Sequence, residues 1–133
     1  MKKIPFILFF LILFFVFAQQ SIVDSLLQSL KTAKDDTGKI NTLNRLSDNC
    51  SRIGENEKAL KYANEALFIC NKVVQTKEIK KGMGNSFNYI GIIYHGQGDI
   101  AKAMEYYLKA LKIFEETGFK KAFAWTNNNI GLL

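Results

Sequence analysis

Apolar residues recur at steps of three and four along most of this chain, which is the pattern of helices that bury one face. The only proline is Pro5, and the alternating β-branched runs expected of strands are missing from the sequence. Glycine-containing segments separate the periodic stretches, as turns between helices do. The pattern therefore predicts an all-α fold.

The first half of the chain predicts three helices. A leading helix is expected over 19–36, with Ser21 and Asp24 placed as a capping box at its start. Residues 35–38 then end that helix and can cap the next one, which is closed by Gly54. A third helix is expected to begin at Glu57 and to run past Val74 into a lysine-rich stretch.

The second half shows the same pattern again. One helix carries Phe87 and Tyr94, and the segment 96–99 makes a turn with two glycines. Its partner helix is terminated by Gly118, and a further helix is expected from Lys120 onward.

Self-comparison shows that these stretches are repeats. A shift of about 44 positions lays Asn44 on Asn88, and a further shift of about 40 lays Asn88 on Asn128. The matches fall mostly at apolar or small positions. The repeating units are expected at about 40–80, 84–118 and an incomplete 120–133.

Small residues are expected to let the helices approach closely. Gly91 and Gly131 are predicted to lie within helices, where glycine costs about 1 kcal/mol relative to alanine. We expect close packing of a partner helix to offset that cost, and large residues such as Tyr107 to fill the spaces between helices. Because one pair cannot bury its apolar face alone, the pairs should stack into a solenoid.

The second unit resembles the tetratricopeptide-repeat family in residue type and spacing. The residues that carry the resemblance are Phe87, Ile90, Gly91, Tyr94, Ala103, Tyr107 and Ala110. The first unit matches more loosely, the third has Asn127 where a large residue is expected, and the family's proline is absent. The resemblance implies a right-handed α-solenoid over 37–133 and a non-catalytic scaffold that binds a protein or peptide.

The first 18 residues have the composition of a secretory signal peptide. Lys2 and Lys3 precede an apolar run from Phe6 to Phe17, and Ala18 stands at a small-residue cleavage site. The run is shorter than the roughly 20 apolar residues that cross a bilayer, although an uncut anchor is the alternative. We therefore expect export to the periplasm or cell envelope of a bacterium, with cleavage after Ala18.

The segments that follow resemble exported repeat modules of Bacteroidetes-type bacteria. The resemblance rests on residues 24–27, 36–37 and 41–47. It implies, as an alternative function, the truncated sensory region of a membrane-bound histidine kinase or transcription regulator. Because the third unit lacks its second helix, we expect a piece of a longer protein. A further alternative is a self-associating module, in which the unpaired last helix docks on a copy of itself.

Candidate chemistry is sparse. His95 is the only histidine, so a histidine-rich metal site is not available, and no cofactor-binding motif is recognisable. Cys50 and Cys70 are expected to lie too far apart for a disulfide and to be separate, half-buried thiols. The net charge of +6 comes from basic residues interspersed with acids, which does not favour nucleic acid as a partner.

Asparagine recurs at one position of the three units, on the helix that lines the concave groove in the resembled family. Such a ladder of amides can hold the backbone of an extended peptide, or it can bond neighbouring helices and stabilise the stack. Helical spacing adds further positions beside it. The peptide-groove candidates are Asn44, Asp48, Arg52, Asn88, Ile92, His95, Trp125 and Asn128.

Overall fold

The computed structural model describes residues 6–133, apart from the side chains of Val16 and Gln19. Within these residues the chain forms helices and no strands. The helices are α1 (Phe6–Thr32), α2 (Asp36–Arg52), α3 (Asn56–Lys72), α4 (Lys77–Gly96), α5 (Ile100–Thr117) and α6 (Lys120–Ile130).

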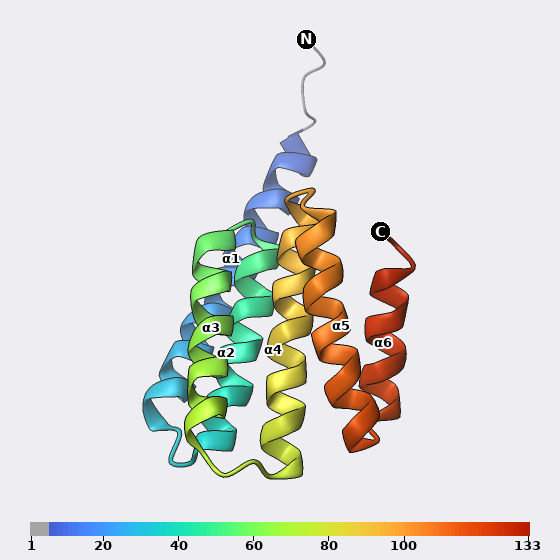
Figure 1. Cartoon of the computed structure of the whole chain (residues 1–133). Coiled ribbons are helices and arrows are strands. Elements are labelled where there is room, and N and C mark those ends of the chain that lie inside the picture. The colour runs from blue at the N-terminus through green and yellow to red at the C-terminus, as the bar shows by residue number, and fades with distance from the viewer. Residues whose placement is uncertain (1–5) are drawn as a thin grey trace.

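Successive helices pack as antiparallel neighbours in an open stack (Figure 1). The pairs are α2 with α3 and α4 with α5, while α1 covers α2 at one side and α6 packs on α5 at the other. The first helices of the two complete pairs, α2 and α4, also contact each other. This arrangement confirms the predicted all-α stack of helix pairs.

The predicted turns are confirmed. Asp35 caps α2 by accepting a hydrogen bond from the Gly38 backbone N–H, and Asp99 caps α5 through the Lys102 backbone N–H. Gly54 and Gly118 follow α2 and α5 with φ of 82° and 74°, a left-handed conformation that side chains disfavour. These residues set the positions at which the chain reverses.

The third helix ends earlier than predicted. It stops at Lys72, and Val73 is extended with φ −105° and ψ 166°. Thr76 then caps a new helix by accepting from the Ile79 backbone N–H at 3.2 Å, and the Gln75 side chain donates to the Cys70 carbonyl. The lysine-rich stretch therefore begins α4, because local caps end one apolar pattern and start the next.

The leading helix begins earlier than predicted. It runs unbroken from Phe6 to Thr32, so Ser21 lies inside it and caps nothing. No glycine or proline interrupts these residues, and helix continues where no breaker stops it. Lys2 and Lys3, the basic start of the predicted signal peptide, lie outside the described residues.

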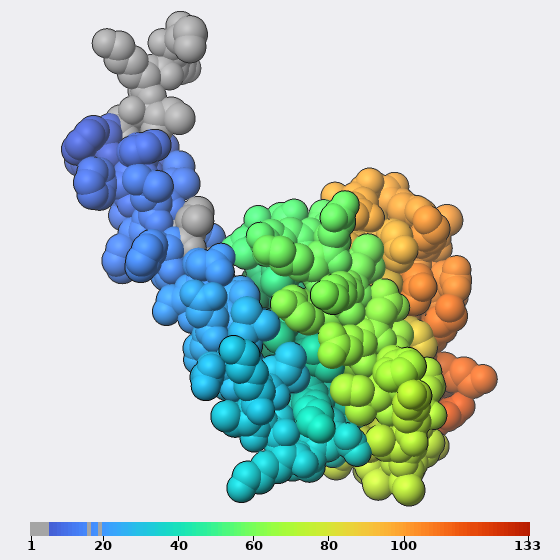
Figure 2. Space-filling model, turned by 90° about the vertical axis from the view of Figure 1, so that its left-hand side faces the viewer, coloured from blue at the N-terminus to red at the C-terminus, as the bar shows by residue number. Residues whose placement is uncertain are grey.

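The two halves of α1 have different surroundings. Its first half projects from the body of the molecule, with its large apolar side chains exposed (Figure 2). In the second half, Val23 and Leu26 are buried against the stack. By length and apolar composition α1 is the one described helix that could cross a membrane, a test that signal sequences near an N-terminus also pass.

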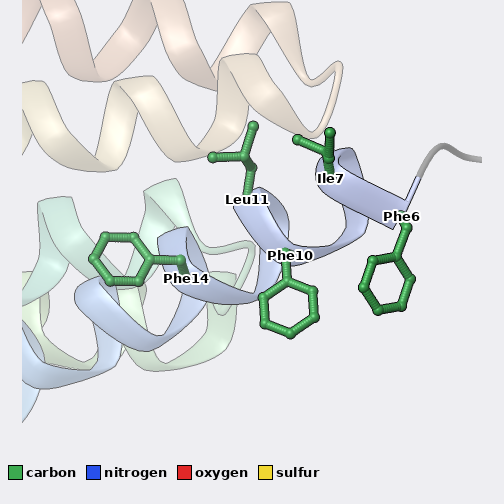
Figure 3. Close-up of a pocket in the computed structure, with 5 residues that line it drawn as sticks. All are labelled: Phe6, Ile7, Phe10, Leu11 and Phe14. Carbon is green, nitrogen blue, oxygen red and sulfur yellow. The ribbon is translucent and has the colours of Figure 1, made fainter.

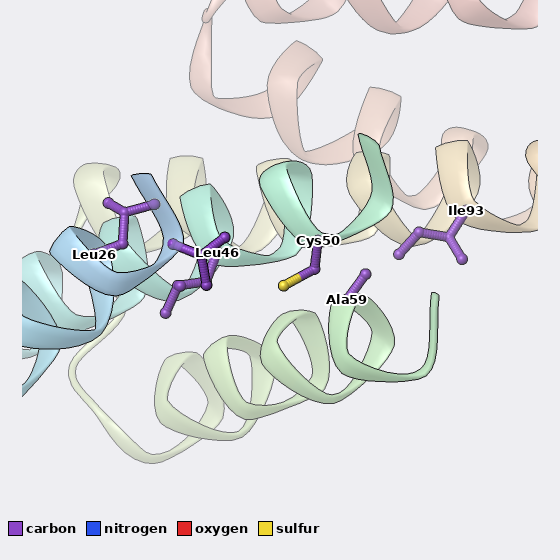
Figure 4. Packing of buried hydrophobic residues seen from close by; sticks show 6 residues of the cluster. Leu26, Leu46, Cys50, Ala59 and Ile93 are labelled. Atoms are coloured by element: carbon purple, nitrogen blue, oxygen red, sulfur yellow. The ribbon is translucent and has the colours of Figure 1, made fainter. Parts of the chain in front are cut away.

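The core forms where α1, α2, α3 and α4 meet (Figure 4). Leu26, Leu46, Cys50, Ala59 and Ile93 pack together there, with small residues on α3 facing larger ones. A second cluster continues between the helices around Leu43 and Ala66. Alternation of large and small side chains lets neighbouring helices interdigitate.

Three glycines of α4 admit large side chains from its neighbours. A β-carbon added to Gly84 would come within 2.5 Å of the Phe114 ring, and one added to Gly91 within 2.5 Å of the Tyr107 ring. Gly82 meets Ile40 of α2 at the same distance. Close helix approach at Gly91 is thus confirmed, whereas the prediction for Gly131 is wrong, because Gly131 ends α6.

Candidate functional site

The candidate site is the face that the first helices of the pairs present away from their partners. We define this first-helix face by Asp48 and Arg52 of α2, Tyr89 of α4 and Trp125 of α6. The Arg52 Nε lies 3.1 Å from the Asp48 carboxylate, one helical turn away. The Tyr89 and Trp125 rings meet edge to face, with centroids 5.6 Å apart at 67°. The face therefore combines an ion pair with an aromatic pair.

Tyr89 links the two parts of this face electrostatically. Burial raises the pKa of its hydroxyl, the Asp48 carboxylate raises it further, and Arg52 and Arg45 act in the opposite direction. The hydroxyl stays protonated at neutral pH, so it can donate one hydrogen bond and accept others. Tyr89 is not among the groove residues predicted from the sequence. The feature of the sequence that could have indicated it is its position next to Asn88, which recurs in the repeat.

Asn44 is used inside the stack. Its side chain is buried, its Nδ2 donates to the Gly82 carbonyl at 2.9 Å, and its Oδ1 accepts from the Ser86 hydroxyl at 2.7 Å. These bonds join α2 to α4 across 38 and 42 residues of sequence. The Asn44 amide therefore stabilises the stack of helices, which is one of the two roles that the sequence allowed for it.

Asn88 is buried at the next step, between α4 and α6. Its Oδ1 accepts from the Asn129 Nδ2 at 3.3 Å, while its own Nδ2 has no hydrogen-bond partner among the described residues. Asn128, the residue expected here from the repeat, is exposed instead. Asn129 therefore takes the position expected for Asn128, because α6 presents the Asn129 side chain to α4.

The remaining candidates lie on the exposed or half-buried surface. Arg52 and Trp125 are exposed, and Asp48, Ile92 and His95 are half-buried. His95 lies in the last turn of α4. Within residues 6–133, no group of three histidine, cysteine or carboxylate side chains is placed to hold a metal ion.

The two cysteines lie apart in the core. Both are free and fully buried, rather than half-buried as predicted. Burial raises the pKa of the Cys70 thiol to about 11, and burial followed by the Glu55 charge raises that of Cys50. A nucleophilic cysteine needs a lowered pKa and access to solvent, and neither thiol has them.

A second aromatic group lies between α4 and α5. The Tyr94 and Tyr106 rings stack with centroids 5.7 Å apart, and Phe87 lies 6.1 Å from Tyr106. The Lys102 Nζ lies 5.0 Å from the Tyr94 ring centre, and the Lys109 Nζ lies 4.7 Å from that of Tyr106. Lysines already cover these rings, so this group joins the helix pair.

The projecting half of α1 carries a shallow apolar hollow. Figure 3 shows its lining side chains on that one helix, pointing in different directions. They are Phe6, Ile7, Phe10, Leu11 and Phe14, around a volume of about 470 Å³. Among residues 6–133, its lining comes from α1 alone and is apolar, whereas a small-molecule site usually also has converging polar groups.

Comparison with known proteins gives one family match, which covers part of the chain. The model of the tetratricopeptide repeat family matches residues 84–117, which cover α4 from Gly84 onward and the whole of α5. No curated protein and no solved structure matches the chain. The match and the all-helical stack together support a tetratricopeptide repeat protein.

Proposed function

We propose that this chain is a non-catalytic scaffold that binds a protein or peptide through its first-helix face. The observation that carries the proposal is the family match at residues 84–117 within a continuous stack of helix pairs. Proteins built of such repeats are typically binding scaffolds. Because each pair adds its first helix to one surface, the stack offers an extended face.

The composition of the face supports this role. Aromatic residues are enriched at protein interfaces, since they supply a large contact area at low entropic cost. Trp125 is 37% exposed and is held by the Tyr89 ring, so a ligand meets a preformed aromatic surface. The Asp48–Arg52 pair next to it offers both signs of charge for polar groups of the ligand.

We further propose that the chain is exported to the cell envelope of a bacterium. The described side chains of α1 up to Ala18 are all exposed, so removal of this segment would leave the described core in place. An uncut segment would instead hold the protein at a membrane. Fractionation of expressing cells and the mass of the mature N-terminus distinguish the two, and a full-length cytoplasmic product would contradict export.

In a second proposal, the same scaffold is the sensory region of a membrane-bound histidine kinase or transcription regulator. The extended face and the exposed apolar segment of α1 are compatible with that role. Reading the gene beyond the codon for Leu133 tests it. An open frame encoding a membrane helix and an output domain would support the proposal, and a stop codon would contradict it.

The binding proposal is tested by removing the aromatic pair. The full chain, kept in an uncharged detergent, is probed against an array of short extended peptides. Tyr89→Ala with Trp125→Ala should abolish the binding shown by the unmodified chain. The matched control is Phe68→Ala, because Phe68 is an aromatic residue 57% exposed on α3, away from the first-helix face. Equal binding by all variants would contradict the proposed face.

A further inference from the structure

Four lysines gather at the end of the stack where α4 and α6 begin. Lys77 and Lys81 come from the first turns of α4, and Lys120 and Lys121 open α6. We call these four residues the lysine patch. The Nζ atoms of Lys77 and Lys81 each lie 5.1 Å from the ring centre of Phe119, which joins α5 to α6. Residues far apart in sequence thus form one basic surface.

The charges of the lysine patch are not neutralised within the described residues. The four ion pairs found there involve other cations, namely Arg52, Lys58, Lys102 and Lys109. The first turn of α6 contains no acidic residue and has no side-chain cap. The positive end of the helix therefore adds to the field of the lysines. Glu78 and Glu116 are the acids nearest to these lysines along the chain.

Two hollows lie side by side at this surface. One, of about 320 Å³, is lined by the patch lysines 81, 120 and 121 and by Phe119. The other, of about 310 Å³, is lined by Phe114 and Phe123 together with Glu115. Gly118 and Lys120 belong to both. A cationic hollow therefore adjoins an apolar one across the turn between α5 and α6.

We infer that this surface binds an acidic peptide segment that carries an apolar side chain. Carboxylates complement the four ammonium groups, and an aromatic or aliphatic side chain fits the hollow beside Phe123. The inference rests on the proposed binding function and adds a second surface, separate from the first-helix face.

The position of the patch favours a peptide over a membrane. The starts of α4 and α6 lie at the lower end of Figure 1, and the apolar start of α1 lies at the upper end. A membrane that holds the apolar half of α1 would therefore be remote from the lysines. The apolar hollow and Glu115 also distinguish this surface from the uniformly basic one that nucleic acid requires.

Fluorescence anisotropy with a labelled synthetic peptide tests the inference. The probe contains aspartate and glutamate around one phenylalanine, and the protein is the full chain in an uncharged detergent. Lys81→Glu with Lys121→Glu should weaken binding about tenfold, and added salt should weaken binding to the unmodified chain. Replacing the phenylalanine of the probe by serine should also weaken binding, because the apolar hollow is then empty.

A matched variant controls for net charge. Lys34→Glu with Lys61→Glu makes the same change in charge at two exposed positions outside the patch and outside the first-helix face, and it should leave the affinity within about twofold. Circular dichroism verifies that both variants fold. Equal weakening by the two variants would overturn the lysine patch as the site.

The remaining outcomes separate this inference from the proposed function. If the acidic probe fails while other peptides of the array bind, the inference is overturned and the scaffold function stands. If no peptide binds at all, both fail. Binding of anionic lipid vesicles or duplex DNA that depends on Lys81 and Lys121, without binding of the probe, would overturn the peptide in favour of those ligands.

Discussion

Gly91 of α4 lies directly against the ring of Tyr107 of α5. A β-carbon at Gly91 would come within 2.5 Å of Tyr107 Cε1 and 2.6 Å of Cδ1. In the first unit the corresponding positions are Ser47 and Ala63, both fully buried. The two helix pairs therefore pack differently at this position. In the second pair a glycine faces a large ring, and in the first pair two small residues face each other.

Gly91→Ala should lower the free energy of unfolding by up to about 2 kcal/mol. The added methyl forces the Tyr107 ring or the helix to move, and this cost exceeds the gain of about 1 kcal/mol in helix propensity. Thermal unfolding followed by circular dichroism measures the change. Gly96→Ala is the control, because its added β-carbon would meet no described atom within 4 Å beyond its chain neighbours and the backbone of its own helix, and it should be neutral or stabilising. Equal effects of the two would contradict the close contact.

Asn44→Ala should destabilise the stack by about 1–3 kcal/mol. The substitution removes both buried hydrogen bonds that join α2 to α4, and leaves the Ser86 hydroxyl and the Gly82 carbonyl with only their mutual bond of 3.0 Å within α4. Asn128→Ala, at the exposed asparagine, should change the free energy of unfolding by less than about 0.5 kcal/mol. Urea titration of both variants measures the difference, and a negligible loss for Asn44→Ala would argue against the structural role of its amide.

Leu26→Ala should lower the free energy of unfolding by about 2–4 kcal/mol, because Leu26 is only 3% exposed in the core shared by α1 and α2. Ile22→Ala is the matched control on the same helix, at a side chain that is 41% exposed, and should cost less than about 1 kcal/mol. Chemical denaturation compares them. If both variants unfold like the unmodified chain, the second half of α1 is not part of the cooperative fold.

The thiols of Cys50 and Cys70 should react slowly in the folded protein and rapidly in urea. Both are buried, and burial raises their pKa values, so little thiolate is available. Alkylation at pH 8 followed by mass spectrometry counts the modified thiols over time. Rapid modification of either residue without denaturant would contradict the buried positions.

The raised pKa of Cys70 also predicts a loss of stability in alkali. The unfolded thiol ionises near its ordinary pKa of 9.0, whereas the folded one stays protonated up to about 11. Between these values the unfolded state binds fewer protons, so the free energy of unfolding falls as pH rises. Cys70→Ala should show a shallower decline over this range, and an unchanged slope would contradict the assignment.

The helical pattern and the turn residues were sufficient to predict most of the fold. Steps of three and four residues report which helix face is buried, and Gly54, Gly98 and Gly118 mark reversals through local backbone conformation. The boundary between α3 and α4 was not found, because apolar residues continue across it. Only the cap made by Thr76 and the hydrogen bond from Gln75 show where one helix ends.

The candidate site was predicted less well, because side-chain roles depend on neighbours that are distant in sequence. The repeat aligned Asn44, Asn88 and Asn128, yet two of them are buried and one is exposed. Whether an asparagine faces a ligand or a neighbouring helix depends on which carbonyl or hydroxyl the next unit brings near it. The same holds for Tyr89, which gains its role from Trp125 on another helix.

The helices, their reversals and the repeat can be predicted from local sequence, because they depend on local conformation and on the period of apolar residues. Tertiary structure decided what each exposed group meets. The contact of Phe119 with Lys77 and Lys81 joins segments about 40 residues apart, and no pattern within either segment signals it. Packing of whole helices brings such groups together, so their arrangement follows from the stack and not from the local sequence.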